Sequence, residues 1–163
     1  MDKIAVLIPC YNEEAVLKET AAAVKGVLES LILSGEISKA SKIAFVDDGS
    51  KDNTGAIADE YAEKYPDIVK DIHQENGGHG EGVNQGLRNA RGMYYKVVDS
   101  DDWVDEKALK ELILTVKRHV KRGIGADLYI HNFVYEHVED NTQKCRSWTK
   151  KFPVGRFFGW EEV

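Results

Sequence analysis

The pattern of hydrophobic and polar positions alternates between two kinds of segment along this chain. Residues 4–8 form a continuous apolar run rich in β-branched side chains, which is typical of a strand buried on both faces. Pro9 cannot donate to a sheet ladder, so the strand is predicted to end there. Apolar residues then recur at three- and four-residue steps over residues 17–31, which predicts an amphipathic helix with Asn12 as a candidate N-cap.

The same alternation continues to about residue 135. Further strands are predicted over residues 42–46, 68–74, 93–98 and 128–135, and further helices start near Thr54, Val83 and Asp105. Residues 76–82 are predicted to form a loop, because their four glycines disfavour regular structure. Repeated strand–helix alternation predicts an α/β fold, with a mostly parallel central sheet and helices on both faces.

Composition narrows the class of protein. The chain has 163 residues and a formal net charge of −6, so one globular domain is expected and a nucleic-acid partner is not. Two cysteines provide neither a disulfide framework nor a Cys-rich zinc site. The first apolar run is too short for a membrane span, which favours a cytoplasmic protein. Peripheral contact with the inner face of the membrane, through segments outside this sequence, stays open.

Acidic residues gather where two predicted strands end. Asp99, Asp101 and Asp102 follow the strand at residues 93–98, and their mutual repulsion favours a bound cation. Carboxylate oxygens suit Mg²⁺ or Mn²⁺, although a solvated turn explains the cluster equally well. A second acidic segment, residues 47–50, follows another strand, and either recognises a ligand or forms a simple turn. Parallel strands would bring both segments to one edge of the sheet.

Other candidate groups carry weaker signals. Tyr11 follows the first strand, where its ring is either a stacking platform or part of the core. The histidines lack metal-ligand spacing, and only His79, inside the glycine-rich segment, is singled out. Cys10 is interpreted as a small buried residue. Neither a P-loop nor a dinucleotide fingerprint is present.

Four motifs, taken in order, resemble the nucleotide-binding half of a family 2 glycosyltransferase with the Rossmann-like GT-A fold. The resemblance covers about residues 3–135, and its motifs are the segments at residues 8–14, 46–54, 76–87 and 97–103. It implies inverting transfer of a sugar from a nucleotide-diphosphate donor, expected to be a UDP-sugar, to an acceptor hydroxyl. The acceptor would be a glycan or a lipid-linked molecule, as in the synthesis of cell-surface polysaccharide.

The resemblance also implies roles for individual residues. It implies that Tyr11 stacks on uracil, that Asp48 hydrogen-bonds the base, and that Pro9 and Glu13 shape the base and ribose pocket. Asp99 and Asp101 match the D-x-D positions, and Asp102 follows them as a further metal-ligand candidate. Asp99 is also counted among the nucleotide-binding residues. The implied cofactor is Mg²⁺ or Mn²⁺.

The C-terminal part of the sequence fits this pattern less well. Residues 1–135 are expected to bind the nucleotide-sugar, and residues 136–163 to begin an incomplete acceptor-side region with a hairpin around its polar turn. The chain is therefore interpreted as the N-terminal portion of a longer protein, with the general base beyond Val163. Such a fragment would bind nucleotide and metal but transfer sugar poorly. The alternatives are a non-catalytic nucleotide-sugar-binding module and a Mg²⁺-dependent phosphotransferase.

Overall fold

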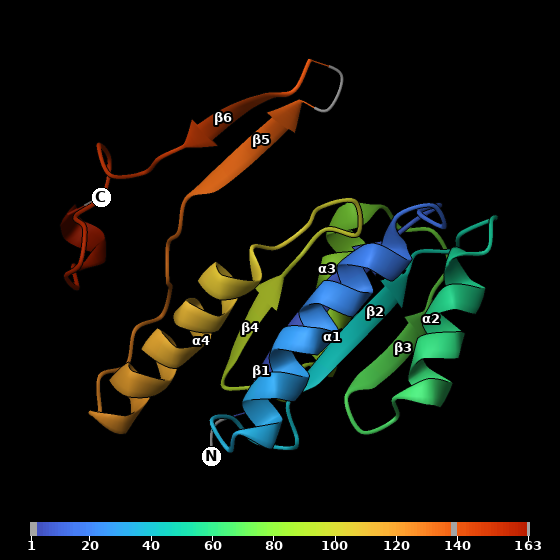
Figure 1. Ribbon diagram of the computed structural model, residues 1–163, viewed down its shortest axis with the longest axis horizontal. Helices are drawn as coiled ribbons and strands as arrows, with labels where there is room; N and C mark the ends of the chain where they lie inside the picture. Colours follow the sequence, from blue (N-terminus) through green and yellow to red (C-terminus); the bar gives the residue numbers. More distant parts are fainter. Residues whose placement is uncertain (1–2, 138–139, 163) are drawn as a thin grey trace. The chain divides into compact units, whose positions relative to one another are not determined.

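A computed structural model describes residues 3–137 and 140–162 (Figure 1). The chain divides into two compact units, residues 1–118 and residues 119–163. The strands are β1 (Ile4–Cys10), β2 (Lys42–Asp47), β3 (Val69–His73), β4 (Tyr94–Val97), β5 (Phe133–His137) and β6 (Thr142–Arg146). The helices are α1 (Leu17–Leu33), α2 (Thr54–Lys64), α3 (His79–Asn89), α4 (Glu106–Lys121) and the short 3₁₀ helix η1 (Trp160–Glu162).

The first unit contains a four-stranded parallel sheet. Its strand order is β3-β2-β1-β4, so β1 lies at the centre, as its uniformly buried side chains require (Figure 1). In the register of β1 with β2, Ala5 lies opposite Lys42 and Cys10 opposite Asp47. The predicted α/β class and the parallel sheet are confirmed.

Helices cover both faces of this sheet, as predicted. Alternate side chains of β1 enter two separate cores, because successive residues of a strand point to opposite faces. Val6 and Ile8 pack in the larger core with apolar residues of α1, α2 and α4, whereas Ala5 and Leu7 pack on the other face against α3. Within the described residues, no helix combines the length and the apolarity needed to cross a bilayer.

Two local predictions in the first loop are wrong. β1 continues through Pro9 to Cys10, since β4 pairs with β1 only as far as Leu7 and the missing N–H of Pro9 therefore costs no bond on that side. Asn12 does not cap α1, which begins at Leu17 without a side-chain cap. Asn12 instead adopts a positive φ of 57° and bonds to the loop after β2.

The glycine-rich segment is also more regular than predicted. Helix α3 begins at His79, so only the residues before it form a loop. Close packing accounts for this difference. A Cβ at Gly82 would lie 3.3 Å from Pro9 Cβ, and one at Gly86 would lie 3.0 Å from Leu7 Cδ1. These glycines let the helix approach β1 closely, and the resulting burial offsets their low helix propensity.

The second unit contains the antiparallel hairpin β5–β6. Phe133 lies opposite Arg146, and His137 lies opposite Thr142. The predicted hairpin is confirmed, although part of its turn, residues 138–139, lies outside the described residues. The strand predicted over residues 128–135 is wrong: it starts only at Phe133 and pairs with β6 rather than with the parallel sheet. The functional division at residue 135 stays a prediction.

Candidate functional site

The loops that follow β1, β2, β3 and β4 leave the same edge of the parallel sheet. This arrangement confirms that the two acidic strand ends, residues 47–50 and 99–102, share one edge. In open α/β sheets, ligands bind at this edge because the strand order there leaves a crevice between loops. The ring of Tyr11, directly after β1, is 41 % exposed and so is accessible to a stacking partner.

The loops after β1 and β2 are joined by reciprocal hydrogen bonds. The amide of Asn12 donates to Ser50 Oγ at 3.0 Å, and the amide of Lys51 donates back to Asn12 Oδ1 at 2.8 Å. The amide of Glu13 donates to Thr54 Oγ1 at 2.7 Å. These bonds satisfy backbone groups that neither strand nor helix would satisfy, and they fix the two loops as one structure.

Asp52 strengthens this connection by accepting hydrogen bonds from both segments. Its Oδ1 accepts from the amide of Thr54 at 2.9 Å, at the start of α2, while its Oδ2 accepts from the amide of Glu14 at 3.3 Å. Glu14 Oε2 in turn accepts from the amide and the side chain of Asn53. Polar residues after β2 thus organise both the helix start and the neighbouring loop.

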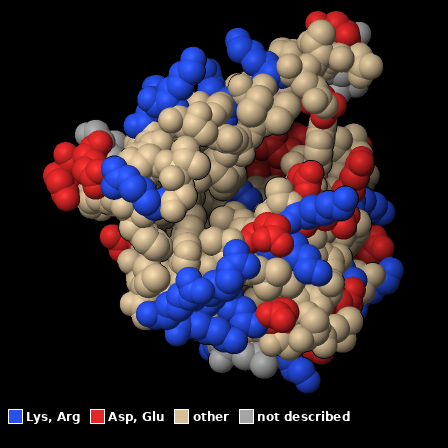
Figure 2. All heavy atoms as spheres, turned by 60° about the vertical axis from the view of Figure 1, so that its left-hand side comes forward, with Lys and Arg blue, Asp and Glu red and all other residues tan. Residues whose placement is uncertain are grey.

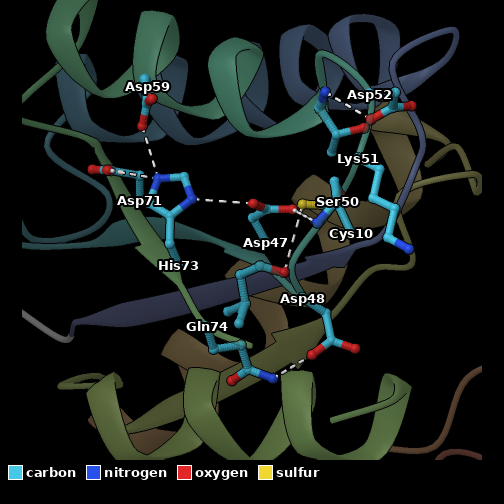
Figure 3. Close-up of polar contacts among 12 residues, drawn as sticks. Cys10, Asp47, Asp48, Ser50, Lys51, Asp52, Asp59, Asp71, His73 and Gln74 are labelled. Atoms are coloured by element: carbon cyan, nitrogen blue, oxygen red, sulfur yellow. Dashed lines mark hydrogen bonds and ion pairs between the residues drawn. The ribbon is translucent and has the colours of Figure 1, made fainter. Parts of the chain in front are cut away.

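Asp48 is buried at the centre of the site. It is 3 % exposed, and its Oδ1 accepts from Gln74 Nε2 and from the amide of Gly77 at 2.8 Å (Figure 3). Its Oδ2 accepts from the amide of Gly78 at 2.8 Å. Burial raises the pKa of Asp48, but the hydrogen bonds from Gly77, Gln74 and Gly78 outweigh it and hold the pKa below its usual value. Asp48 therefore orders the glycine segment as an ionised carboxylate.

Gln74 is a residue that the sequence did not reveal. Its Nε2 donates to Asp48, whereas its Oε1 is buried without a hydrogen-bond partner in the described part of the chain. An unpaired buried acceptor is unusual in native proteins and calls for a specific explanation. No pattern in the sequence distinguishes this glutamine from a surface residue.

The second acidic strand end is held by α1. Thr20 is buried, and its Oγ1 lies 3.1 Å from the carbonyl oxygen of Ser100 and 2.7 Å from that of Asp102. Within the turn, the amide of Asp102 donates to the carbonyl oxygen of Asp99 at 3.0 Å. These hydrogen bonds hold the backbone of the turn to α1, while Asp101 and Asp102 stay exposed.

Negative charge accumulates around this turn. Partial burial and the neighbouring carboxylates of Asp99 and Asp101 raise the pKa of Asp102. Burial, with smaller contributions from Asp101 and Asp52, also raises the pKa of Glu13. The carboxylate of Asp101 therefore acts electrostatically on the loop after β1. Two basic side chains lie near these carboxylates. His79 Nε2 is 3.7 Å from Asp99 Oδ1, and Lys96 on β4, whose pKa is lowered by burial, is influenced by Asp102 and Asp99.

The chemistry of this donor set fits a divalent cation. Asp99, Asp101 and Asp102 provide hard oxygen ligands, and a cation would relieve the repulsion that raises the pKa of Asp102.

Asp59, Asp71 and His73 form a different cluster, in which one ligand atom from each residue lies within 4.8 Å of the others. We assign no metal to it, because the His73 ring already lies between the carboxylates. Within the described residues, the D-x-D carboxylates do not converge as closely.

Cys10 has no nucleophilic role in this structure. The thiol is buried, and desolvation, with Asp47 and Glu13 nearby, raises its pKa to about 12. Since the thiolate is the reactive form of cysteine, this residue is inert at neutral pH. Its Sγ lies 3.5 Å from the carbonyl oxygen of Val46, which agrees with the interpretation of Cys10 as a small buried residue.

A parallel α/β sheet with helices on both faces and acidic loops at its carboxyl edge agrees with the predicted GT-A fold. Residues 5–160 match the model of glycosyl transferase family 2, and the chain belongs to this family. The predicted resemblance is thereby confirmed. Among curated relatives, glycosyltransferase GlyA of Streptococcus pneumoniae serotype 4 is 34 % identical over 132 residues, which are 81 % of this chain and 17 % of GlyA.

Solved structures agree with this assignment. The crystal structure of Staphylococcus aureus TarS residues 1–349 superposes with a TM-score of 0.59 at 28 % identity, covering 72 % of this chain and 33 % of that one. TarS is a poly(ribitol-phosphate) β-N-acetylglucosaminyltransferase, and it has also been solved with UDP-GlcNAc and with UDP. This chain spans between 12 and 42 % of the length of the curated relatives it matches.

Proposed function

We propose that this chain binds the nucleotide part of a UDP-linked sugar donor together with Mg²⁺ or Mn²⁺, and forms the donor half of an inverting glycosyltransferase. The observation that carries the proposal is the shared edge of the two acidic strand ends, together with the hydrogen bonds that join the loops after β1 and β2. The complexes of TarS with UDP-GlcNAc and UDP support the choice of uracil nucleotide. A cell-wall or other surface glycan acceptor accords with the named activity of TarS.

Residues from the loops after β1 and β2 would bind the base of the nucleotide. Tyr11 would offer its exposed ring to the base, and Pro9, Glu13 and Asp48 are the proposed residues of the base and ribose pocket. Asp48 would contribute its remaining acceptor capacity to the base, since each carboxylate oxygen has two lone pairs.

The metal would be held by the turn after β4. Asp99, Asp101 and Asp102 are the proposed ligands, and Asp99 also faces the nucleotide. When bound, the metal supplies a Lewis acid that neutralises charge on the departing diphosphate. The base that deprotonates the acceptor hydroxyl is proposed to lie outside these 163 residues, so this chain alone should bind donor without efficient transfer.

The first test is the thermal stability of this chain with UDP, GDP, CDP and dTDP, each with and without Mn²⁺. A ligand at about 100 times its dissociation constant stabilises the folded state by roughly 2.7 kcal/mol. We expect a shift with UDP that requires Mn²⁺. The absence of a shift with every nucleotide would contradict the proposal.

Asp101→Asn tests the metal site. The substitution should abolish the Mn²⁺-dependent part of UDP affinity and leave the fold intact, because it removes one carboxylate of a repulsive cluster. Asp140→Asn is the matched control, since Asp140 Oδ1 accepts hydrogen bonds from the nearby Thr142 in the hairpin. Unchanged Mn²⁺-dependent affinity of the Asp101→Asn variant would exclude Asp101 as a ligand.

The phosphotransferase alternative finds less support. Such enzymes usually carry a nucleophilic aspartate after the first strand, whereas Tyr11 and Asn12 follow β1 here. The raised pKa of Cys10, about 12, also argues against a thiol nucleophile. Trapping of a phosphorylated enzyme would distinguish the two reactions, and we expect none.

A further inference from the structure

Asp47 is a buried carboxylate directly before Asp48 in the chain. It is 6 % exposed, and its Oδ1 accepts from the amide of Ser50 at 3.1 Å. Its Oδ2 lies 3.1 Å from His73 Nδ1, at the end of β3. A buried carboxylate is costly unless hydrogen bonds and an opposite charge compensate for its lost hydration. The His73 ring is the side-chain partner of this buried carboxyl group.

The His73 ring lies between carboxylates on both of its nitrogen atoms (Figure 3). Its Nε2 is 2.8 Å from Asp59 Oδ1 and 3.4 Å from Asp71 Oδ2. A neutral imidazole has one N–H donor, so its other nitrogen would point a lone pair at a carboxylate. Only the imidazolium donates to Asp47 and Asp59 at once. The geometry thus requires the protonated ring.

Each element around the ring contributes negative charge. Asp47 comes from β2, Asp59 from α2 and Asp71 from β3 itself. Helix α2 comes close enough because residue 55 is glycine: a Cβ there would lie 2.9 Å from Asp47 Oδ2 and 3.6 Å from His73 Cε1. Burial alone would lower the pKa of His73, but the hydrogen bonds to Asp47 and Asp59 raise it above its usual value.

A continuous series of contacts leads from this ring to the loops after β2 and β1. His73 pairs with Asp47, Asp47 accepts from the amide of Ser50, and Ser50 Oγ accepts from the amide of Asn12. The same loop carries Asp48. We propose that His73 is a positioning residue whose imidazolium fixes Asp47, and with it the loop after β2, in the arrangement that binds the uracil nucleotide. This inference rests on the proposed function.

The sign of the pH dependence follows from the direction of the pKa shift. A histidine with a raised pKa in the folded state contributes its stabilisation at low pH and loses it as the pH rises through that pKa. Donor affinity should therefore fall as His73 loses its proton, above the usual histidine value of about 6.5.

The test measures UDP affinity by calorimetry, with Mn²⁺ present, between pH 5.5 and pH 8.5. His73→Gln keeps a polar side chain without a titrating ring, and His137→Gln removes an exposed imidazole from the hairpin as the matched control. Titration of UDP itself is common to all variants, so affinities are compared as ratios at each pH. At low pH the wild type should bind at least about fivefold tighter than His73→Gln, the lower end of ordinary coupling. This ratio should approach one at high pH, and a ratio independent of pH would overturn the proposal.

Asp59→Asn provides a second variant should His73→Gln fold poorly. It keeps an acceptor oxygen opposite Nε2 but removes a charge, so the midpoint of the pH dependence should move to lower pH. An unchanged midpoint would contradict the role of His73.

The nuclear magnetic resonance shift of the Ser50 amide proton, measured without nucleotide, separates the two proposals. If the Ser50 shift follows the titration of His73 but UDP does not bind, the proposed function is refuted while the effect of His73 on the loop after β2 is retained. If UDP binds but the Ser50 shift ignores His73, the positioning role is refuted.

Discussion

Replacing Thr20 by valine tests how α1 supports the acidic turn. Thr20 is 3 % exposed, and its hydroxyl lies 2.7 Å from the carbonyl oxygen of Asp102 and 3.1 Å from that of Ser100. Valine keeps the branched shape and nearly the same helix propensity, so no cavity and no new helix preference are introduced. The substitution therefore isolates the loss of the hydroxyl.

The magnitude follows from the hydrogen bonds. A hydroxyl has one proton, so Thr20→Val removes one shared hydrogen bond and takes the donor away from the carbonyl oxygens of Ser100 and Asp102, at a cost of about 1–3 kcal/mol. For a chain of this size each kcal/mol corresponds to about 2–4 °C in Tm, so the melting temperature should fall by about 2–12 °C. Urea unfolding and a thermal scan measure both quantities.

A control on α4 makes the result specific. Thr115 Oγ1 accepts from Arg118 in an exposed contact, so Thr115→Val should stay within about 0.5 kcal/mol of the wild type. Thr20→Ser should retain most of the stability, because it keeps the hydroxyl. If Thr20→Val were as stable as Thr115→Val, the assigned role of the hydroxyl would be refuted. If Thr20→Val lost stability but kept the Mn²⁺-dependent UDP affinity of the wild type, the Thr20 hydroxyl would have no part in shaping the proposed metal site.

Three further predictions concern packing and charge. Gly26→Ala in α1 should raise the free energy of unfolding by about 0.5–1 kcal/mol, because nothing lies within 4 Å of the new Cβ. Gly55→Ala should lower the free energy of unfolding by about 1–3 kcal/mol, since its Cβ would lie 2.9 Å from Asp47 Oδ2. Thermal unfolding measures both variants, and the same change in stability for Gly26→Ala and Gly55→Ala would contradict this account. Because the pKa of Asp48 is lowered, its stabilisation should vanish as the pH falls below about 4, and Asp48→Asn should lack this acid-dependent component in urea titrations.

Local patterns were sufficient for the fold class. The buried strand at residues 4–8 and the apolar stripe of α1 each follow from the order of residues close together in the chain. Such local patterns predict the elements and their alternation. The glycines of α3 show where such reasoning fails. Gly82 and Gly86 look like loop residues until the close approach to Pro9 and Leu7 is known.

Local sequence patterns were enough to predict the parallel sheet, the acidic strand ends and their meeting at one edge, because a regular fold places all strand ends by the same rule. The groups that hold those ends in place became known from the packing of the folded chain. Thr20 lies 80 residues before Ser100, and Asp47 lies 26 residues before His73. Such pairs have no periodic signal, since a contact between distant residues depends on how whole elements pack and not on the residues adjacent in the chain.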